Sequence, residues 1–319
     1  MNKALILTDG KAGHENQSKA FARALGCDFE VFEVHFKSKF HKTLSYLFDK
    51  FNLLVLSLFN ATVKGSKDGE GGKTVVPLSD LPFANSYHMV IGTGSGTFYA
   101  AKSLAKKLGV KCGVVLYPRG YKISTFDCVL APAFDRPAKA PNVIEIPANL
   151  VAADEAFYEK GVAAYRERTD VEPEVAVIIG GPNKCSTMSV EWTRQRLDEI
   201  FRLPGKKAVT TSRRTPPEVE ALVDSYPWDY RLLYSKDHFN PIPAFVKLAK
   251  RLYVTAESTG MLSEACTFGS AEVVALDNLN PGPHKFRRFV ENLRAGGYVD
   301  GNRKVDLSAE FAKAKDLLK

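Results

Sequence analysis

Residues 254–265 form the strongest candidate site for chemistry in this sequence. An apolar strand is followed by a loop of small residues, and a helix is expected to begin near Met261. The free backbone N–H groups at such a helix start attract phosphate oxygens. Glu264 lies one turn into that helix, where a carboxylate can accept hydrogen bonds from a ribose diol. Alternatively, Ser258 or Thr259 acts only as a helix cap. The expected nucleotide-binding residues are Ser258, Thr259, Gly260, Met261 and Glu264.

Two other loops in the same half carry groups that suit a diphosphate. Arg213 and Arg214 follow an expected strand among serine and threonine hydroxyls. Guanidinium groups match phosphate oxygens in geometry and charge. A glycine-rich loop after another strand adds Gly181 and Asn183 as candidate ligands of the phosphates. The diphosphate is predicted to lie between Arg213 and the helix start near Met261, although both arginines could also be solvated surface residues.

The N-terminal half offers a general base. Asp9 and His14 lie in a glycine turn between the first expected strand and helix, and histidine exchanges protons near neutral pH. These two residues are the catalytic candidates, with a capping role for His14 as the alternative. The turn lacks the full G-x-G-x-x-G spacing, so a dinucleotide is not expected. Residues 92–97 form a second glycine loop at a strand end, where open α/β sheets bind ligands. The expected acceptor-side residues are Gly10, Gly13, Gln17, Gly94 and Ser95.

No metal ion or bound cofactor is expected, and a nucleoside diphosphate sugar would be the donor substrate. The sequence has no D-x-D triplet, and its five cysteines show neither C-x-x-C nor zinc-finger spacing. Buried free thiols in a reducing compartment are the plain interpretation. Residues 1–9 resemble a strand running into a turn, not a signal peptide. The predicted location is cytoplasmic, with peripheral attachment to the inner face of a membrane as an option.

The elements that must position these loops alternate between strand and helix. A chain of 319 residues is long enough for two domains of about 150 residues. Alternation runs through the first half, is interrupted by a charged helix, and restarts after Pro173. The predicted fold is α/β, with two Rossmann-like domains facing across a cleft, as in the GT-B architecture. The expected boundaries are 1–152 for the acceptor domain and 173–300 for the nucleotide-sugar domain. A C-terminal helix within 301–319 is expected to pack back on the first domain.

The charge balance favours an anionic partner. The formal net charge is +8, which suits a phosphorylated substrate or an anionic membrane, and no nucleic-acid-binding motif is present. Residues 36–63, from Phe36 to Val63, combine lysines with a dense apolar stretch. Charged residues interrupt the apolar run before it reaches the roughly 20 residues that a membrane-spanning helix needs. The segment is either a buried helix pair or a basic amphipathic segment that contacts an anionic membrane.

These motifs, taken in order, resemble the elongated-mitochondria-type mitochondrial fission protein family along nearly the whole chain. Glu257 stands where that family usually has Asp, and Thr259 where it often has Val. A more distant similarity connects the last loop to the lipid-linked N-acetylglucosamine transferase of peptidoglycan synthesis. The family resemblance rests on residues 9–17, 126–127, 131–135, 142–143, 180–183, 212–216, 240–241, 254–258 and 263–266.

Bacterial members of that family are regarded as GT-B glycosyltransferases, so the resemblance implies sugar transfer from a nucleoside diphosphate sugar. The acceptor is expected to be a lipid-linked or cell-envelope glycan, and inversion at the sugar is implied by analogy alone. One alternative is a non-catalytic, membrane-associated scaffold, as in mitochondrial fission. Another is a nucleotide-sugar epimerase of the same fold, which would need further carboxylates such as Asp9, Glu15 and Asp237.

Overall fold

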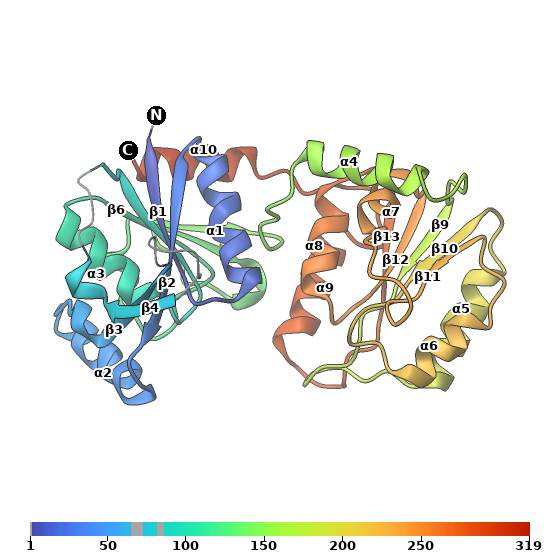
Figure 1. The fold of residues 1–319 in the computed structure, drawn as a ribbon, viewed down its shortest axis with the longest axis horizontal. Helices are drawn as coiled ribbons and strands as arrows, with labels where there is room; N and C mark the ends of the chain where they lie inside the picture. Colours follow the sequence, from blue (N-terminus) through green and yellow to red (C-terminus); the bar gives the residue numbers. More distant parts are fainter. Residues whose placement is uncertain (1, 65–72, 82–85) are drawn as a thin grey trace. The chain divides into compact units, whose positions relative to one another are not determined.

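The computed structural model describes residues 2–64, 73–81 and 86–319 and divides the chain into two compact units (Figure 1). Unit 1 comprises Met1–Ile146 with Leu307–Lys319, and unit 2 comprises Pro147–Asp306. The break between Ile146 and Pro147 therefore lies a few residues before the expected end of the first domain at residue 152. The charged helix expected to link the domains, α4 (Glu155–Arg166), belongs to unit 2 and packs against α7 (Ile242–Leu248).

Unit 1 is built on a mixed eight-stranded sheet with the order β4-β3-β2-β1-β5-β6-β7-β8. Neighbouring strands are parallel except in the pairs β2–β3 and β3–β4. The strands are β1 (Lys3–Thr8), β2 (Asp28–Phe36), β3 (Phe59–Lys64), β4 (Lys73–Pro77), β5 (Met89–Thr93), β6 (Lys111–Val115), β7 (Cys128–Pro132) and β8 (Val143–Ile146). The helices are α1 (Ala12–Ala24), α2 (Lys39–Lys50), α3 (Phe98–Leu108) and α10 (Ser308–Leu317), and α10 contacts β7 and β8. The 3-10 turns are η1 (Leu56–Leu58), η2 (Leu78–Asp80), η3 (Ile123–Thr125) and η4 (Ala133–Asp135).

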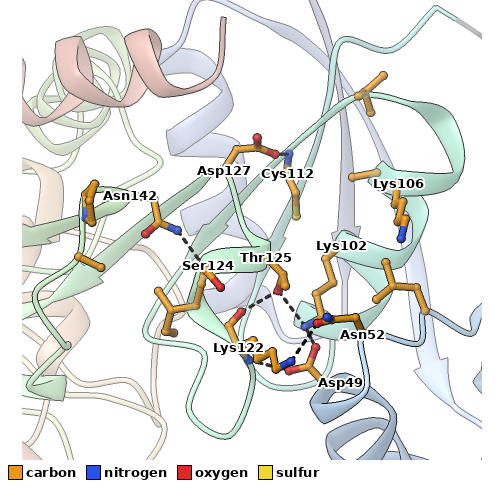
Figure 2. A pocket seen from close by; sticks show the side chains of 16 residues that line it. Asp49, Asn52, Lys102, Lys106, Cys112, Lys122, Ser124, Thr125, Asp127 and Asn142 are labelled. Atoms are coloured by element: carbon orange, nitrogen blue, oxygen red, sulfur yellow. Dashed lines mark hydrogen bonds and ion pairs between the residues drawn. The ribbon is translucent and has the colours of Figure 1, made fainter.

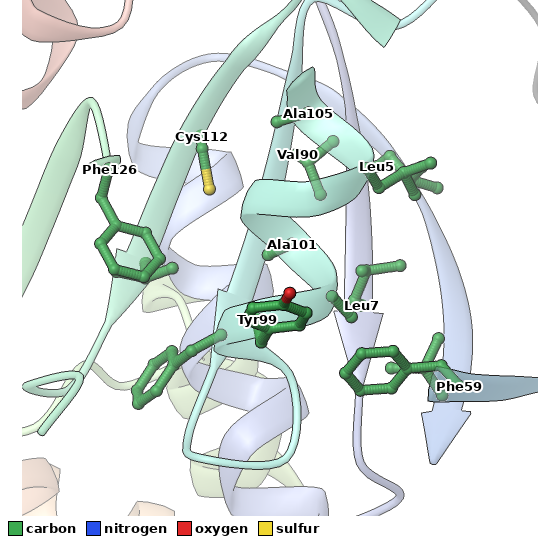
Figure 3. Packing of buried hydrophobic residues seen from close by; sticks show 14 of the residues in the cluster. Leu5, Leu7, Phe59, Val90, Tyr99, Ala101, Ala105, Cys112 and Phe126 are labelled. Carbon is green, nitrogen blue, oxygen red and sulfur yellow. The ribbon is translucent and has the colours of Figure 1, made fainter. Parts of the chain in front are cut away.

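The core of unit 1 forms between this sheet and α3. Strands β1 and β5 are apolar and buried on both faces, as expected for central parallel strands. Figure 3 shows Tyr99 and Ala101 of α3 packed toward Leu7 of β1. The Tyr99 hydroxyl donates a hydrogen bond of 2.6 Å to the carbonyl oxygen of Leu53, which ties the segment after α2 to this core.

Residues 36–63 do not form the helix pair considered from the sequence. They comprise one helix, α2, then the turn η1 and most of β3, which pairs antiparallel with β2. Leu58 and Phe59 are buried, so the apolar run after the helix serves the sheet and not a second helix. No helix within the described ranges is long and apolar enough to cross a bilayer.

Unit 2 contains a fully parallel five-stranded sheet with the order β11-β10-β9-β12-β13. Its strands are β9 (Val175–Ile178), β10 (Lys207–Thr210), β11 (Tyr230–Leu232), β12 (Arg251–Thr255) and β13 (Glu272–Leu276). Besides α4 and α7, its helices are α5 (Val190–Phe201), α6 (Pro217–Asp224), α8 (Thr259–Thr267) and α9 (Lys285–Ala295). All five cysteines of the chain are free thiols; Cys185 is half-buried and the others are buried.

Each sheet has one point where the strand order reverses. In unit 1, β1 lies between β2 and β5, and in unit 2, β9 lies between β10 and β12. At such a point the loops that leave two neighbouring strands turn to opposite faces and open a crevice, where open α/β sheets bind ligands. Loops predicted as functional follow β1 and β5 in unit 1 and β9 and β12 in unit 2.

Candidate functional site

An aspartate–histidine pair occupies the reversal point of unit 1. His14 lies in the first turn of α1, and its Nδ1 atom is 3.0 Å from Oδ1 and 3.1 Å from Oδ2 of Asp9. Lys11 Nζ contacts the same carboxylate at 2.7 Å. Burial acts to raise the pKa of Asp9, but the bonds from Lys11 and His14 outweigh it and hold that pKa below its ordinary value. An ionised Asp9 therefore fixes the imidazole through Nδ1, and Nε2 makes no hydrogen bond within the described part of the chain, so it can exchange a proton.

The glycine loop after β5 packs against this pair. A Cβ atom at Gly94 would lie 2.4 Å from Cε1 of the His14 ring, and Gly94 has a φ of +85°. At Gly96, a Cβ atom would lie 2.8 Å from Cβ of Asp9. Glycine is therefore required at both positions, because any side chain would displace one member of the pair. The structure brings the first and second predicted loops together at one site.

The other residues predicted on the acceptor side lie in the same two loops or at the start of α1, and they differ in their contacts. Ser95 Oγ accepts a hydrogen bond of 2.9 Å from Lys42 Nζ of α2. Gly10 turns the chain with a φ of +78°, and nothing lies within 4 Å of the Cβ position at Gly13. Gln17 donates weakly to the Gly13 carbonyl at 3.4 Å, while its Oε1 atom is buried without a partner in the described part of the chain. The surface beside Gly13 is thus open to a ligand.

The centre of the candidate site in unit 2 is Glu257, a residue that the sequence interpretation does not include among the ligands. Its side chain is fully buried. Oε1 accepts hydrogen bonds from the Gly181 N–H at 2.9 Å and from the Thr255 hydroxyl at 3.1 Å, and Oε2 accepts one from Asn278 at 2.7 Å. This carboxylate fastens the loop after β9 to the end of β12 across the reversal point.

The glycines of the loop after β9 are required for packing within the protein. A Cβ atom at Gly180 would lie 2.0 Å from Oε1 of Glu257, and one at Gly181 would lie 2.1 Å from the backbone oxygen of Arg214. Thr215 reinforces this contact, since its hydroxyl donates to the Gly180 carbonyl at 2.6 Å. Three predicted motifs, which follow β9, β10 and β12, therefore converge at one corner.

The two predicted arginines lie in different parts of unit 2. Arg214 Nη1 donates to the Gly181 carbonyl at 3.0 Å, and its Nη2 atom lies 3.9 Å from Glu257 Oε1. Arg213 instead lines a cavity of about 520 Å³ beyond β10 and β11, together with Lys236 and the buried Glu220. Of the pair, Arg214 is the one attached to the corner where β9 and β12 end.

The start of α8 presents unpaired donors at this corner. The helix begins at Thr259, earlier than the expected Met261, and the Ser258 side chain makes no capping bond. Among the residues that the structure describes, the backbone N–H groups of Thr259, Gly260 and Met261 donate no hydrogen bond. Gly260 is exposed and has open space at its Cβ position. These donors can bind an oxyanion.

Glu264 lies one turn further along α8 and is held by a residue from α4. The Tyr158 hydroxyl donates to Glu264 Oε1 at 2.8 Å. Burial raises the pKa of Glu264, and the bond from Tyr158 opposes that shift in part. Asn183 is less available as a ligand, because its Oδ1 atom already accepts a hydrogen bond of 2.7 Å from the Cys185 N–H.

A cavity of unit 1 lies away from these loops. It measures about 970 Å³, and its lining includes Cys112, Asp127 and Asn142 at or just before the amino ends of β6, β7 and β8 (Figure 2). The Asp9–His14 pair follows the opposite, carboxyl end of β1. Lys102 and Asp49 form a buried ion pair in its wall, and Asp49 also accepts a hydrogen bond of 2.6 Å from the Lys122 N–H. Lys102 and Asp49, the buried charges among the described lining residues, therefore satisfy one another.

The remaining candidates from the sequence are metal ligands and the carboxylates that an epimerase would need. No cluster of metal-ligating side chains occurs within residues 2–64, 73–81 and 86–319. Glu15 pairs with Lys19 at 2.6 Å on α1, and Asp237 accepts hydrogen bonds from Arg168 and from the Phe239 N–H. Of the proposed acid–base carboxylates, Asp9 is the one that contacts an imidazole of the site.

Solved structures of sugar-nucleotide proteins share the fold. UGT89C1 of Arabidopsis thaliana, complexed with UDP-L-rhamnose, aligns with a TM-score of 0.54 at 10% identity, over 99% of this chain and 89% of that one. A Listeria monocytogenes protein described as a UDP-N-acetylglucosamine 2-epimerase aligns with a TM-score of 0.53 at 11% identity, over 99% and 87%. The chain therefore has the two-domain α/β fold of GT-B glycosyltransferases and epimerases.

Sequence comparison gives the family. Mitochondrial fission protein ELM1 of Arabidopsis thaliana is 24% identical over 367 residues, covering 94% of this chain and 84% of that protein. The model of the family described as mitochondrial fission ELM1 matches residues 12–313. This match spans nearly the whole chain and confirms the resemblance drawn from the motifs, so the chain belongs to the mitochondrial fission ELM1 family.

Proposed function

We propose that this protein is a glycosyltransferase that moves a sugar from a nucleoside diphosphate sugar to a hydroxyl acceptor without a metal ion. The observation that carries the proposal is the Asp9–His14 pair, held at a strand-order reversal by close contacts with Gly94 and Gly96. A fold shared with sugar-nucleotide proteins supports it. The acceptor class that we favour is a lipid-linked or cell-envelope glycan.

The donor would bind at the corner of unit 2 where β9 and β12 end. The unpaired N–H groups at the start of α8 and the guanidinium of Arg214 would neutralise the leaving diphosphate, the role that a metal ion plays elsewhere. Arg213 would add charge from the neighbouring cavity. The Oε2 atom of Glu264 would accept hydrogen bonds from the ribose, since Tyr158 contacts Oε1.

His14 would act as the general base. Its Nε2 atom would take the proton of the acceptor hydroxyl while the acceptor oxygen attacks the anomeric carbon. The bond from that carbon to the diphosphate oxygen breaks, and the diphosphate leaves with the electron pair. Asp9 would hold the imidazole in the required tautomer and stabilise its protonated form. Inversion at the anomeric carbon is the expected outcome of this single displacement.

Two other functions have specific support and predict different results. The family name favours a non-catalytic scaffold, which would bind no nucleotide sugar. The Listeria neighbour favours an epimerase, which would convert a nucleotide sugar without an acceptor. Against the scaffold, the close packing of Gly94 on His14 preserves an arrangement that a scaffold does not need.

Calorimetric titration of UDP and GDP tests the donor site. The variant Arg214→Ala should weaken nucleotide binding by about one to two decades, because a charge-assisted hydrogen bond is worth about 1.5–3 kcal/mol. Glu264→Gln should weaken nucleotides more than free pyrophosphate, since only the ribose contact changes. Arg196→Ala is the matched control, because Arg196 pairs with Glu199 on α5. A nucleotide that binds both site variants as tightly as the wild type would disprove the donor site.

Turnover tests the acceptor side. His14→Ala and Asp9→Asn should each lower transfer or donor hydrolysis by about two to four decades while leaving the affinity for UDP unchanged. Wild-type protein that binds no nucleotide at all would favour the scaffold. Conversion of a UDP-sugar to its epimer in the absence of an acceptor would identify the epimerase instead.

A further inference from the structure

Exposed apolar side chains are concentrated on α2 and the residues directly after it. Within the described residues, seven large apolar side chains are exposed, and four of them lie on α2 or directly after it. Their exposed fractions are 69% for Phe40, 48% for Leu47, 68% for Phe51 and 51% for Leu53. Apolar groups that gather in this way on a soluble surface usually mark an interaction site.

The opposite face of α2 prevents the helix from rotating to bury these residues. The Ser45 hydroxyl is 2.8 Å from that of Tyr121, and Asp49 pairs with the buried Lys102. Phe40 and Leu47 are seven positions apart on the helix and share the outward face. Figure 1 shows α2 at the periphery of unit 1. The apolar face is therefore a fixed surface of the folded unit.

Unpaired cations border this face. Lys37, Lys39 and Lys50 are exposed, and none of them forms an ion pair within the part of the chain that the structure describes. By comparison, the exposed Lys236 pairs with Asp224 at 2.7 Å. We name these seven side chains the α2 surface: Lys37, Lys39, Phe40, Leu47, Lys50, Phe51 and Leu53.

We infer that the α2 surface docks unit 1 on an anionic lipid membrane. The phenylalanines and leucines enter the boundary between headgroups and acyl chains, and the three lysines contact anionic headgroups. A second copy of the chain fits less well, because a two-fold contact would bring the same lysines face to face. Within the wider segment 36–63, the residues that contact the lipid are therefore those of the α2 surface.

The α2 surface is connected to the Asp9–His14 pair. Lys42 of α2 donates to Ser95, and Ser95 follows Gly94, which lies against the His14 ring. An acceptor that reaches His14 while α2 is docked therefore lies at the membrane surface. The acceptor is then an amphiphilic molecule with a polar hydroxyl group. This step rests on the proposed function, whereas the docking itself does not.

Co-sedimentation with vesicles tests the docking. Phosphatidylcholine vesicles that contain phosphatidylglycerol should pull down the wild type, and pure phosphatidylcholine vesicles should do so much less. The variant Phe40→Ser with Phe51→Ser should lose about tenfold or more in apparent affinity. The charge reversal Lys37→Glu with Lys39→Glu should lose binding to anionic vesicles, and added salt should weaken the wild type in the same way. Lys42 is left intact because it contacts Ser95.

Matched controls and separate measurements keep the result clear. Val75→Ser and Phe157→Ser change exposed apolar residues outside the α2 surface, with exposed fractions of 62% and 45%, and should bind as the wild type does. Equal binding by wild type and both α2 variants, or no binding of the wild type, overturns the inference. A dimer in sedimentation velocity that Phe40→Ser with Phe51→Ser breaks assigns the surface to a second copy instead. UDP titration of the same variants reports the donor site independently of docking.

Discussion

The Tyr158 hydroxyl of α4 donates a hydrogen bond of 2.8 Å to Glu264 Oε1 of α8. The ring of Tyr158 also stacks on Phe268, with centroids 4.4 Å apart. A helix expected to act as a linker therefore positions the carboxylate predicted to bind ribose. Burial raises the pKa of Tyr158 as well as that of Glu264, so the hydroxyl stays protonated and keeps its role as donor.

Replacing Glu264 with Gln should stabilise the protein near neutral pH. The folded pKa of Glu264 lies above its ordinary value of 4.5, so its contribution to stability is greatest below that value and is lost as the pH rises through the folded pKa. Gln carries no charge, and its oxygen still accepts from Tyr158. The melting temperature should rise by about 2–4 °C for each 1 kcal/mol gained.

Thermal unfolding of wild type and Glu264→Gln, at neutral pH and below pH 4.5, checks this expectation. The difference between the two proteins should shrink on acidification. A difference that is independent of pH would mean that the buried charge has no part in it.

Replacing Gly94 with Ala should impair the Asp9–His14 pair. The new methyl group would overlap the His14 ring, and the φ of +85° strains any L-residue. Stability should fall by about 1–3 kcal/mol. Turnover should fall more steeply than the affinity for UDP, because the donor corner lies in the other sheet.

Gly109→Ala is the matched control, since Gly109 has a φ of +69° but nothing within 4 Å of its Cβ position. It should cost about 1 kcal/mol of stability and leave turnover unchanged. Equal turnover in the Gly94 and Gly109 variants would show that Gly94 does not position His14.

Replacing Lys102 with Met should destabilise unit 1 by about 3–5 kcal/mol, because it leaves the Asp49 carboxylate buried without its cation. Urea unfolding measures this loss. The control Lys236→Met breaks an exposed ion pair with Asp224 and should cost less than about 1 kcal/mol. If the two variants lose equal stability, the Lys102–Asp49 pair is not what fastens α2 to the core.

Local sequence patterns were sufficient to predict the alternation of strands and helices. Helix α3 (Phe98–Leu108) continues the alternation expected in the first half, and glycine loops follow β1, β5 and β9. Apolar runs and turn residues act over a few positions, so they can be interpreted without the rest of the chain. The pairing of Asp9 with His14 could also be predicted from the sequence, because a single turn of the chain brings the two residues together.

Residues 36–63 show where local patterns fail. The apolar run around Leu58 and Phe59 is equally consistent with a second helix, and only pairing between β3 and β2 makes it a strand. The outward face of α2 is likewise defined by Lys102 and Tyr121, which lie far along the chain. Short apolar runs do not reveal which of their partners will cover them.

The tertiary structure alone decided the composition of the site in unit 2. Glu257 became its centre because the strand order places β9 beside β12, so that a carboxylate after one strand meets the Gly181 N–H after the other. Arg213 and Arg214 are adjacent in sequence, yet the contact of Arg214 with Gly181 separates their roles. Propensity and spacing act between near neighbours, whereas strand order follows from the burial of side chains across the whole sheet, and that long-range packing determines which loops meet.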